Sequence, residues 1–187
     1  MDEMITTLNE ELHLKKIPYV VIGGIAASLL GKPRMTMDSD IVIVLDNAKV
    51  PEFIHGMRQR GFSVSASSEP KIISRLQRGL PVKLRYRKHF SVDVRIAHYS
   101  LDTNAIRRAK SYHLFSVRLP IASPEDLVAF KIARFNALDQ SDIQAIFAKQ
   151  PKIDKSYLRI AAEQLVDETG NAQIQSNLEV ALGWLKK

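Results

Sequence analysis

The sequence predicts an α/β protein with a small mixed, mostly antiparallel sheet, helices on one face, and a helical C-terminal part. A strand, a glycine turn, a helix and a second strand follow one another over residues 19–45. Apolar and charged residues alternate along 82–87 and 91–96, which indicates a hairpin with one apolar and one charged face. Apolar residues recur at helical spacing in the last third of the chain. We expect residues 1–122 to form the core and residues 123–187 to form a helical part packed on it.

The composition is that of an ordinary globular protein, with 45% hydrophobic and 25% charged residues in a chain of 187. There is no cysteine, which excludes a disulfide framework and a thiolate metal site. No apolar run approaches transmembrane length, and the N-terminus lacks the apolar core of a signal peptide. We therefore expect a cytoplasmic protein without a membrane partner.

Residues 2–16 are predicted to form a helix, because apolar residues recur there at helical spacing. The apolar run over residues 19–22 then predicts a strand that ends at Gly23 and Gly24. Glycine allows close backbone approach, and the N-terminus of the helix expected over residues 25–30 can hold a phosphate. The pair is thus predicted either to admit a phosphate group or to form a tight turn that binds nothing.

Two aspartates begin the next strand, and their side chains are predicted to lie on the same face. Asp38 and Asp40 are two residues apart, and successive side chains of a strand alternate between its faces. Adjacent like charges are unfavourable unless a cation lies between them. Because carboxylate oxygens suit Mg²⁺ or Mn²⁺, the pair predicts a divalent-metal site. Arg34, in the basic turn before them, is a candidate phosphate contact.

The middle of the chain is predicted to lead into the hairpin through a helix, a short strand and a second helix. The first helix is expected over residues 47–60 and ends at Gly61, a common helix-ending residue. A strand over 62–66 and a surface segment with one helix over 67–80 follow. The turn of the hairpin is predicted at residues 88–89.

The charged face of the hairpin carries one acid among several cations. Asp93 lies in mid-strand, where aspartate is disfavoured. It is predicted either to form an ion pair with Arg85 or another arginine of the same face, or to be a metal ligand. Lys83, Arg85 and Arg87 are predicted to share this face and to bind the phosphates of an acceptor. A solvated basic face is the alternative for the acid-free stretch 71–88.

The segment between the hairpin and the C-terminus is predicted to be mainly helical. Its clearest helix start is Ser123, which is followed by proline and two acids, a combination that caps a helix and complements its dipole. The predicted elements are a helix over 102–110, a strand over 112–119, and helices over 124–137, from 139, over 153–166 and over 172–186.

The glycine turn and the acidic strands together resemble the nucleotidyltransferase superfamily typified by DNA polymerase beta. That family carries a Gly-Gly or Gly-Ser turn, then Asp-x-Asp on a strand, and a third acid on a later strand. Gly23-Gly24, then Asp38 and Asp40, and finally Asp93 match this pattern. The resemblance implies that the three aspartates hold two Mg²⁺ ions, that Asp93 helps to deprotonate an acceptor, and that the glycines admit a triphosphate.

The helical segment is similar to that of one subgroup, the AbiEii-type toxin nucleotidyltransferases and their uncharacterised relatives. Asp126, Lys131, Arg134, Asp139 and Asp142 match its motif in order, whereas the arginine that commonly precedes the final acids is absent. The resemblance makes Lys131 a candidate phosphate contact. It also implies a toxin–antitoxin system with a cognate antitoxin protein as partner.

These resemblances imply an enzyme that transfers a nucleoside monophosphate from a nucleoside triphosphate such as ATP to an acceptor hydroxyl, with Mg²⁺ or Mn²⁺ as cofactor. RNA, including a tRNA end, or a protein hydroxyl is the expected acceptor, and the basic hairpin favours RNA. One alternative is an antibiotic nucleotidyltransferase of the aminoglycoside or lincosamide kind. Another is a catalytically silent regulator that binds nucleotide or RNA.

Overall fold

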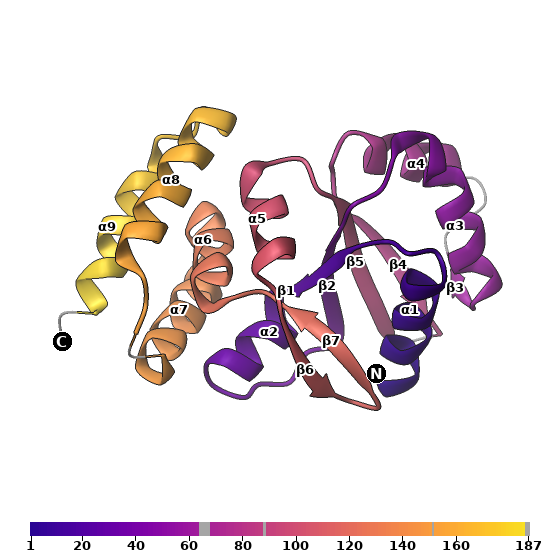
Figure 1. The fold of residues 1–187 in the computed structure, drawn as a ribbon, viewed down its shortest axis with the longest axis horizontal. Helices are drawn as coiled ribbons and strands as arrows, with labels where there is room; N and C mark the ends of the chain where they lie inside the picture. The colour runs from indigo at the N-terminus through magenta and orange to yellow at the C-terminus, as the bar shows by residue number, and fades with distance from the viewer. Residues whose placement is uncertain (64–67, 88, 151, 186–187) are drawn as a thin grey trace.

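The computed structural model describes residues 1–63, 68–87, 89–150 and 152–185. Within these residues a seven-stranded mixed sheet has the order β3-β4-β5-β2-β1-β7-β6 (Figure 1). The strands are β1 (Tyr19–Ile22), β2 (Asp38–Ile43), β3 (Phe62–Ser63), β4 (Val82–Tyr86), β5 (Phe90–Ile96), β6 (Lys110–Leu114) and β7 (Val117–Ile121).

Parallel pairing joins β1 to β7 and β2 to β5, and the other neighbouring strands are antiparallel. The predicted mixed, mostly antiparallel sheet and the β4–β5 hairpin are therefore confirmed. The parallel pairing of β2 with β5 sets Asp40 directly opposite Asp93, and Asp38 opposite Ser91. This register, made between strands some 50 residues apart in the sequence, brings the acidic residues together.

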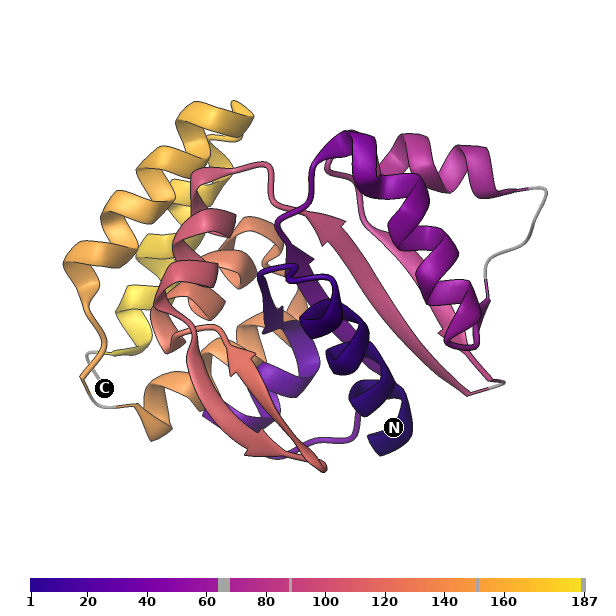
Figure 2. The same cartoon turned by 45° about the vertical axis from the view of Figure 1, so that its right-hand side comes forward.

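Helices flank the sheet, and the core lies between the sheet and these helices (Figure 2). Tyr19 in β1 donates a hydrogen bond to Asn9 of the first helix, and this helix contacts the helix over Val50–Gln59. On the face that carries Asp93, Arg95 pairs with Asp102 and lies over the ring of Phe130. The helices are α1 (Asp2–Leu14), α2 (Gly23–Leu30), the 3-10 turn η1 (Asn47–Lys49), α3 (Val50–Gln59), α4 (Glu69–Gln77), α5 (Ser100–Arg108), α6 (Pro124–Arg134), α7 (Ala137–Lys149), α8 (Lys155–Thr169) and α9 (Gln173–Trp184).

The single strand predicted over residues 112–119 is wrong, because two strands, β6 and β7, form a hairpin there. The turn contains no glycine, so its sequence gives little indication of a reversal. Phe115 adopts a left-handed conformation with φ 54°. The backbone N–H and the hydroxyl of Ser116 both donate to the carboxylate of Asp2, each at 2.9 Å. A tertiary contact with the N-terminal helix therefore stabilises this turn.

The helix predicted over 124–137 ends earlier, and the next helix begins earlier than residue 139. Ser123 caps α6 as predicted, with its hydroxyl accepting from the N–H of Asp126. Phe135 leaves the helical conformation with φ 51°, and the side chain of Asn136 then caps α7. The boundary predicted between residues 122 and 123 falls between the end of β7 and the start of α6.

Several predicted positions lie outside the described residues. They are residues 64–66 of the strand predicted over 62–66, residue 67 of the following segment, residue 88 of the hairpin turn, and residue 186. Of the helices in the described ranges, none is both long enough and apolar enough to span a membrane.

Candidate functional site

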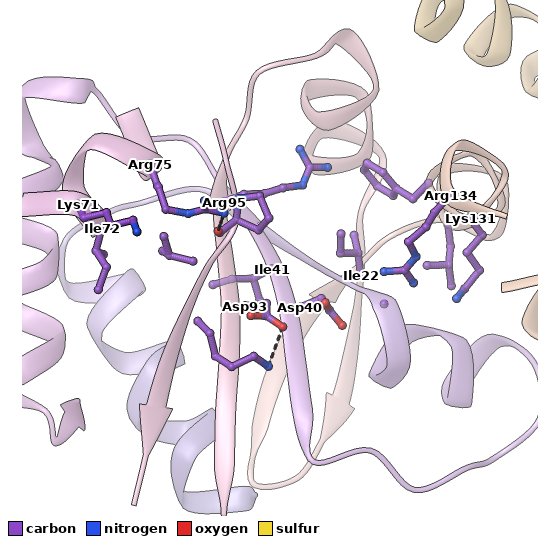
Figure 3. A pocket seen from close by; sticks show the side chains of 16 residues that line it. Ile22, Asp40, Ile41, Lys71, Ile72, Arg75, Asp93, Arg95, Lys131 and Arg134 are labelled. Carbon is purple, nitrogen blue, oxygen red and sulfur yellow. Dashed lines mark hydrogen bonds and ion pairs between the residues drawn. The ribbon is translucent and has the colours of Figure 1, made fainter. Parts of the chain in front are cut away.

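A cavity of about 690 Å³ opens beside the aspartate strands, and its walls come from β1, β2, β4, β5, α4 and α6 (Figure 3). Sites for small ligands typically have volumes of about 300–1,000 Å³. Asp40 and Asp93 lie in the middle of the cavity. Lys71 and Arg75 of α4 flank them on one side, and α6 contributes cations on the other. The arrangement therefore suits an anionic ligand that extends across two carboxylates.

Asp40 is a largely buried carboxylate without a cationic partner among the described residues. Its Oδ2 atom lies 3.4 Å from the backbone N–H of Gly24. Burial, and after it the negative charge of Asp93, raises the pKa of Asp40 above its usual range. Burial and the neighbouring charge of Asp93 therefore both disfavour the ionised carboxylate of Asp40, and a bound cation would offset this cost.

Asp38 and Asp93 share one internal cation, the ammonium group of Lys83. The Nζ atom of Lys83 lies 3.2 Å from Asp38 Oδ2 and 3.0 Å from Asp93 Oδ2. Ser91 donates a hydrogen bond to Asp38, and this bond, followed by the contact with Lys83, lowers the pKa of Asp38. The alternative ion pair predicted for Asp93 therefore exists, but its partner is Lys83 instead of an arginine.

The chemistry of the donors fits a hard divalent cation, although their spacing in the described residues does not yet bring three of them around one ion. Three carboxylates project from the same face of two adjacent strands, Asp38 and Asp40 from β2 and Asp93 from β5, and such oxygens suit Mg²⁺ or Mn²⁺. In the part of the chain that the structure describes, no three His, Cys, Asp or Glu residues are grouped closely enough to hold an ion. The ammonium of Lys83 lies between two of these three carboxylates.

The glycine pair allows α2 to begin against the carboxylate of Asp40. Gly23 has φ +63°, a conformation that residues with a Cβ rarely adopt. A Cβ atom at this position would lie 1.9 Å from Asp40 Oδ2, so no other residue fits without moving the aspartate. Close packing therefore explains Gly23, while contact between the glycines and a phosphate stays a prediction.

Replacing Gly23 should destabilise the protein by more than backbone strain alone, because the new side chain would displace Asp40. We expect Gly23→Ala to lower the free energy of unfolding by about 1–3 kcal/mol more than Gly170→Ala, because overpacking a filled site carries a cost of this size. Gly170 is a matched control, since its φ is +70° and, apart from its chain neighbours, no atom of the described residues lies within 4 Å of the added Cβ. Chemical denaturation of both variants measures the difference, and equal losses would contradict the proposed contact.

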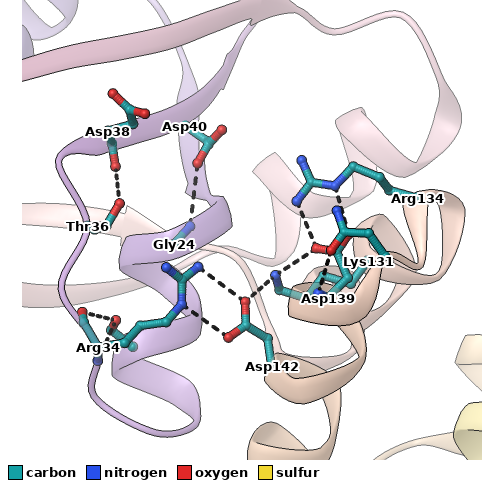
Figure 4. A network of polar contacts seen from close by, with 11 residues as sticks. Gly24, Arg34, Thr36, Asp38, Asp40, Lys131, Arg134, Asp139 and Asp142 are labelled. Carbon is teal, nitrogen blue, oxygen red and sulfur yellow. Dashed lines mark hydrogen bonds and ion pairs between the residues drawn. The ribbon is translucent and has the colours of Figure 1, made fainter.

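A network of ion pairs joins α6 and α7 to the basic turn before β2 (Figure 4). Lys131 is 3% exposed, and its Nζ lies 2.7 Å from Asp142 Oδ2 and 3.2 Å from Asp139 Oδ1. Arg34 reaches Asp142 from the turn with an Nε–Oδ1 distance of 3.2 Å. Lys131 lines the cavity, whereas Arg34 does not. Both predicted phosphate contacts are thus already paired with carboxylates, and their binding of phosphate stays a prediction.

Arg134 lines the cavity from the same network, although its motif position in the sequence did not suggest a role. Its Nη2 atom pairs with Asp139 Oδ1 at 2.7 Å, yet 63% of its side chain is exposed. Its positive charge partly offsets the raised pKa of Asp40. Arg134 is therefore the α6 cation best placed to meet a ligand.

Two of the three hairpin cations share the face of Asp93, as predicted, and the third does not. Lys83 lies opposite Asp93 and lines the cavity, whereas Arg85, two residues farther along β4 and opposite Ser91, is on the same face but does not line the cavity. Arg87 follows the end of β4, has φ 53°, and pairs with Glu3 of α1. The positive φ breaks the strand alternation, so the shared face predicted for Arg87 is wrong.

Comparison with solved structures shows that this is a nucleotidyltransferase-like fold. An antigenic nucleotidyltransferase-like protein from Paracoccidioides brasiliensis matches with a TM-score of 0.51 and 20% identity, over 95% of this chain and 92% of that chain. The lincosamide antibiotic adenylyltransferase LnuA, bound to lincomycin, matches with a TM-score of 0.51 and 15% identity, over 77% of this chain and 94% of that chain. Neither a family model nor a curated protein matches the sequence. The predicted fold is thus confirmed, while membership of the nucleotidyltransferase superfamily and of the AbiEii-type subgroup stays a prediction.

Proposed function

We propose that this protein is a metal-dependent nucleotidyltransferase, which moves a nucleoside monophosphate from a nucleoside triphosphate to an acceptor hydroxyl. The observation that carries the proposal is the register of β2 and β5, which sets Asp40 against Asp93 inside a cavity with cations on both sides. The start of α2 lies against the carboxylate of Asp40 through Gly24. The nucleotidyltransferase-like fold supports the same conclusion.

In this proposal Asp40 and Asp93, together with Asp38, would hold Mg²⁺ or Mn²⁺. Such an ion supplies charge neutralisation at the attacking and leaving oxygens of phosphoryl transfer. Asp93 would accept the proton of the acceptor hydroxyl, since it lines the cavity and its side chain is 29% exposed. Arg134 and the N-terminus of α2 would bind and orient the triphosphate.

The α4 wall points to an acceptor that carries negative charge. Lys71 and Arg75 line the cavity opposite α6, and the guanidinium of Arg75 donates to the carbonyl of Pro81 at 3.1 Å, which orients it. A triphosphate on the α6 side leaves these two cations for the second substrate. We therefore propose an RNA acceptor, and a cationic antibiotic is the less suitable acceptor because like charges would repel it.

RNA binding should depend on the α4 cations and on salt. The double change Lys71→Glu, Arg75→Glu should weaken binding of single-stranded RNA, and each phosphate contact should contribute about −0.7 to the log–log salt slope. The control is Lys110→Glu, Arg118→Glu, which alters charge equally on the β6–β7 hairpin. Fluorescence anisotropy between about 50 and 200 mM salt measures both. A flat salt dependence in the parent would exclude the RNA acceptor.

The transfer reaction itself is tested with each labelled triphosphate, Mg²⁺, and total cellular RNA or protein as acceptor. Label in the RNA fraction supports the proposal, and label in protein redirects it to a protein hydroxyl. Triphosphate that binds without ever being consumed would favour the silent regulator. Co-purification of a protein that suppresses transfer would test the predicted antitoxin partner.

A further inference from the structure

Lys83 occupies the position between two of the three carboxylates that the proposed function assigns to a divalent ion. It lies directly opposite Asp93 in the antiparallel β4–β5 pair, and its side chain extends across β5 to reach Asp38 on β2. The hydroxyl of Ser91, 3.2 Å from Nζ, completes the set of contacts around the ammonium group. One lysine thus neutralises carboxylates from two strands.

The balance of charge shows that this arrangement is incomplete. Lys83 supplies one positive charge to a cluster of three aspartates, and Asp40 has no cation within ion-pairing distance among the described residues. A divalent ion that used the facing oxygens of Asp38 and Asp93 would meet the ammonium already there. Both cannot occupy the same contacts, since two like charges at this separation repel strongly.

We propose that Lys83 is a resident counter-cation, which a divalent ion displaces and which then binds the phosphates of the substrate. Its side chain is 42% exposed, so it has room to move, and it also lines the cavity. The inference rests on the proposed function and adds that binding of the metal ion and binding of the triphosphate depend on each other. The ion alone must compete with Lys83, whereas a triphosphate provides the displaced ammonium with a new partner. Metal and triphosphate should therefore strengthen each other's binding, and linkage requires the effect to be reciprocal.

The test is Mn²⁺ binding, measured by electron paramagnetic resonance or calorimetry with and without a non-hydrolysable triphosphate. Lys83→Met should bind Mn²⁺ alone about tenfold more tightly than the parent, because two partly exposed ion pairs no longer oppose the metal. The strengthening of Mn²⁺ binding by triphosphate should shrink in the same variant. Lys83→Gln keeps the side chain polar and of similar length, and it should show the same two changes. It replaces Lys83→Met in the test if that variant folds poorly.

Arg85→Met is the matched control, since it removes one positive charge from the same strand. Unlike Lys83, Arg85 forms no ion pair with Asp38 or Asp93. Its affinity for Mn²⁺ alone should equal that of the parent. An unchanged or weaker affinity in both Lys83 variants would overturn the inference and leave the proposed function standing. A parent protein that binds no Mn²⁺, even with triphosphate, would overturn the proposed function itself.

Discussion

Asp40→Asn is expected to abolish nucleotidyl transfer while the protein remains folded. Loss of a charged ligand of a catalytic metal removes several kcal/mol of transition-state stabilisation, and about 4 kcal/mol corresponds to roughly a thousandfold in rate. The amide retains an oxygen that can accept the hydrogen bond donated by Gly24. Transfer of label from the triphosphate, measured at saturating Mg²⁺, gives the rate of each protein.

The same variant should be at least as stable as the parent at neutral pH without metal. Burial and the charge of Asp93 raise the folded-state pKa of Asp40, so its ionised form destabilises the fold. The advantage of Asp40→Asn should decline as the pH falls through this raised pKa, where the parent carboxyl becomes protonated and neutral. Urea unfolding at neutral and acidic pH measures the difference in free energy of unfolding between the variant and the parent. A variant that is inactive and also much less stable would show that Asp40 has a structural role.

Lys131→Met is expected to destabilise the protein by about 3–5 kcal/mol, because removing one partner leaves buried charges uncompensated. Asp139 is fully buried, and ion pairs with Arg134 and Lys131 lower its pKa even though burial opposes ionisation. Without the lysine, the only cation among the described residues that still pairs with Asp142 is Arg34, and the only one that still pairs with Asp139 is the largely exposed Arg134. Thermal or denaturant unfolding measures the loss.

Arg134→Met provides the comparison, since it removes an equal charge from the same helix. Its own side chain is largely exposed, and Lys131 still pairs with Asp139 after its removal, so the expected loss is about 1–3 kcal/mol and smaller than that of Lys131→Met. If Lys131→Met is no more destabilising than Arg134→Met, the network does not depend on its buried lysine. Lys131 would then be better explained as the phosphate contact that the sequence resemblance implies.

The arrangement of strand, glycine turn, helix and acidic strand could be predicted from the sequence alone. These elements are local, because short apolar runs mark the strands and glycine marks the turn before α2. The same face of Asp38 and Asp40 follows from their spacing. Ser123 likewise predicted the start of α6, because helix capping depends only on residues a few positions apart in the sequence.

Tertiary structure alone decided which charges meet. The ion pairs of Lys83 depend on the register of three strands, β2, β5 and β4, and those of Lys131 on the packing of α6 against α7. Alternation along β4 did not predict the direction of the Arg87 side chain. Arg87 itself has a left-handed backbone conformation, and its side chain pairs with Glu3. Ion pairs can form between residues at any separation in the sequence, so local patterns do not predict them. The residue pattern therefore identified the carboxylates of the site, whereas only the folded sheet determined that a lysine lies between two of them.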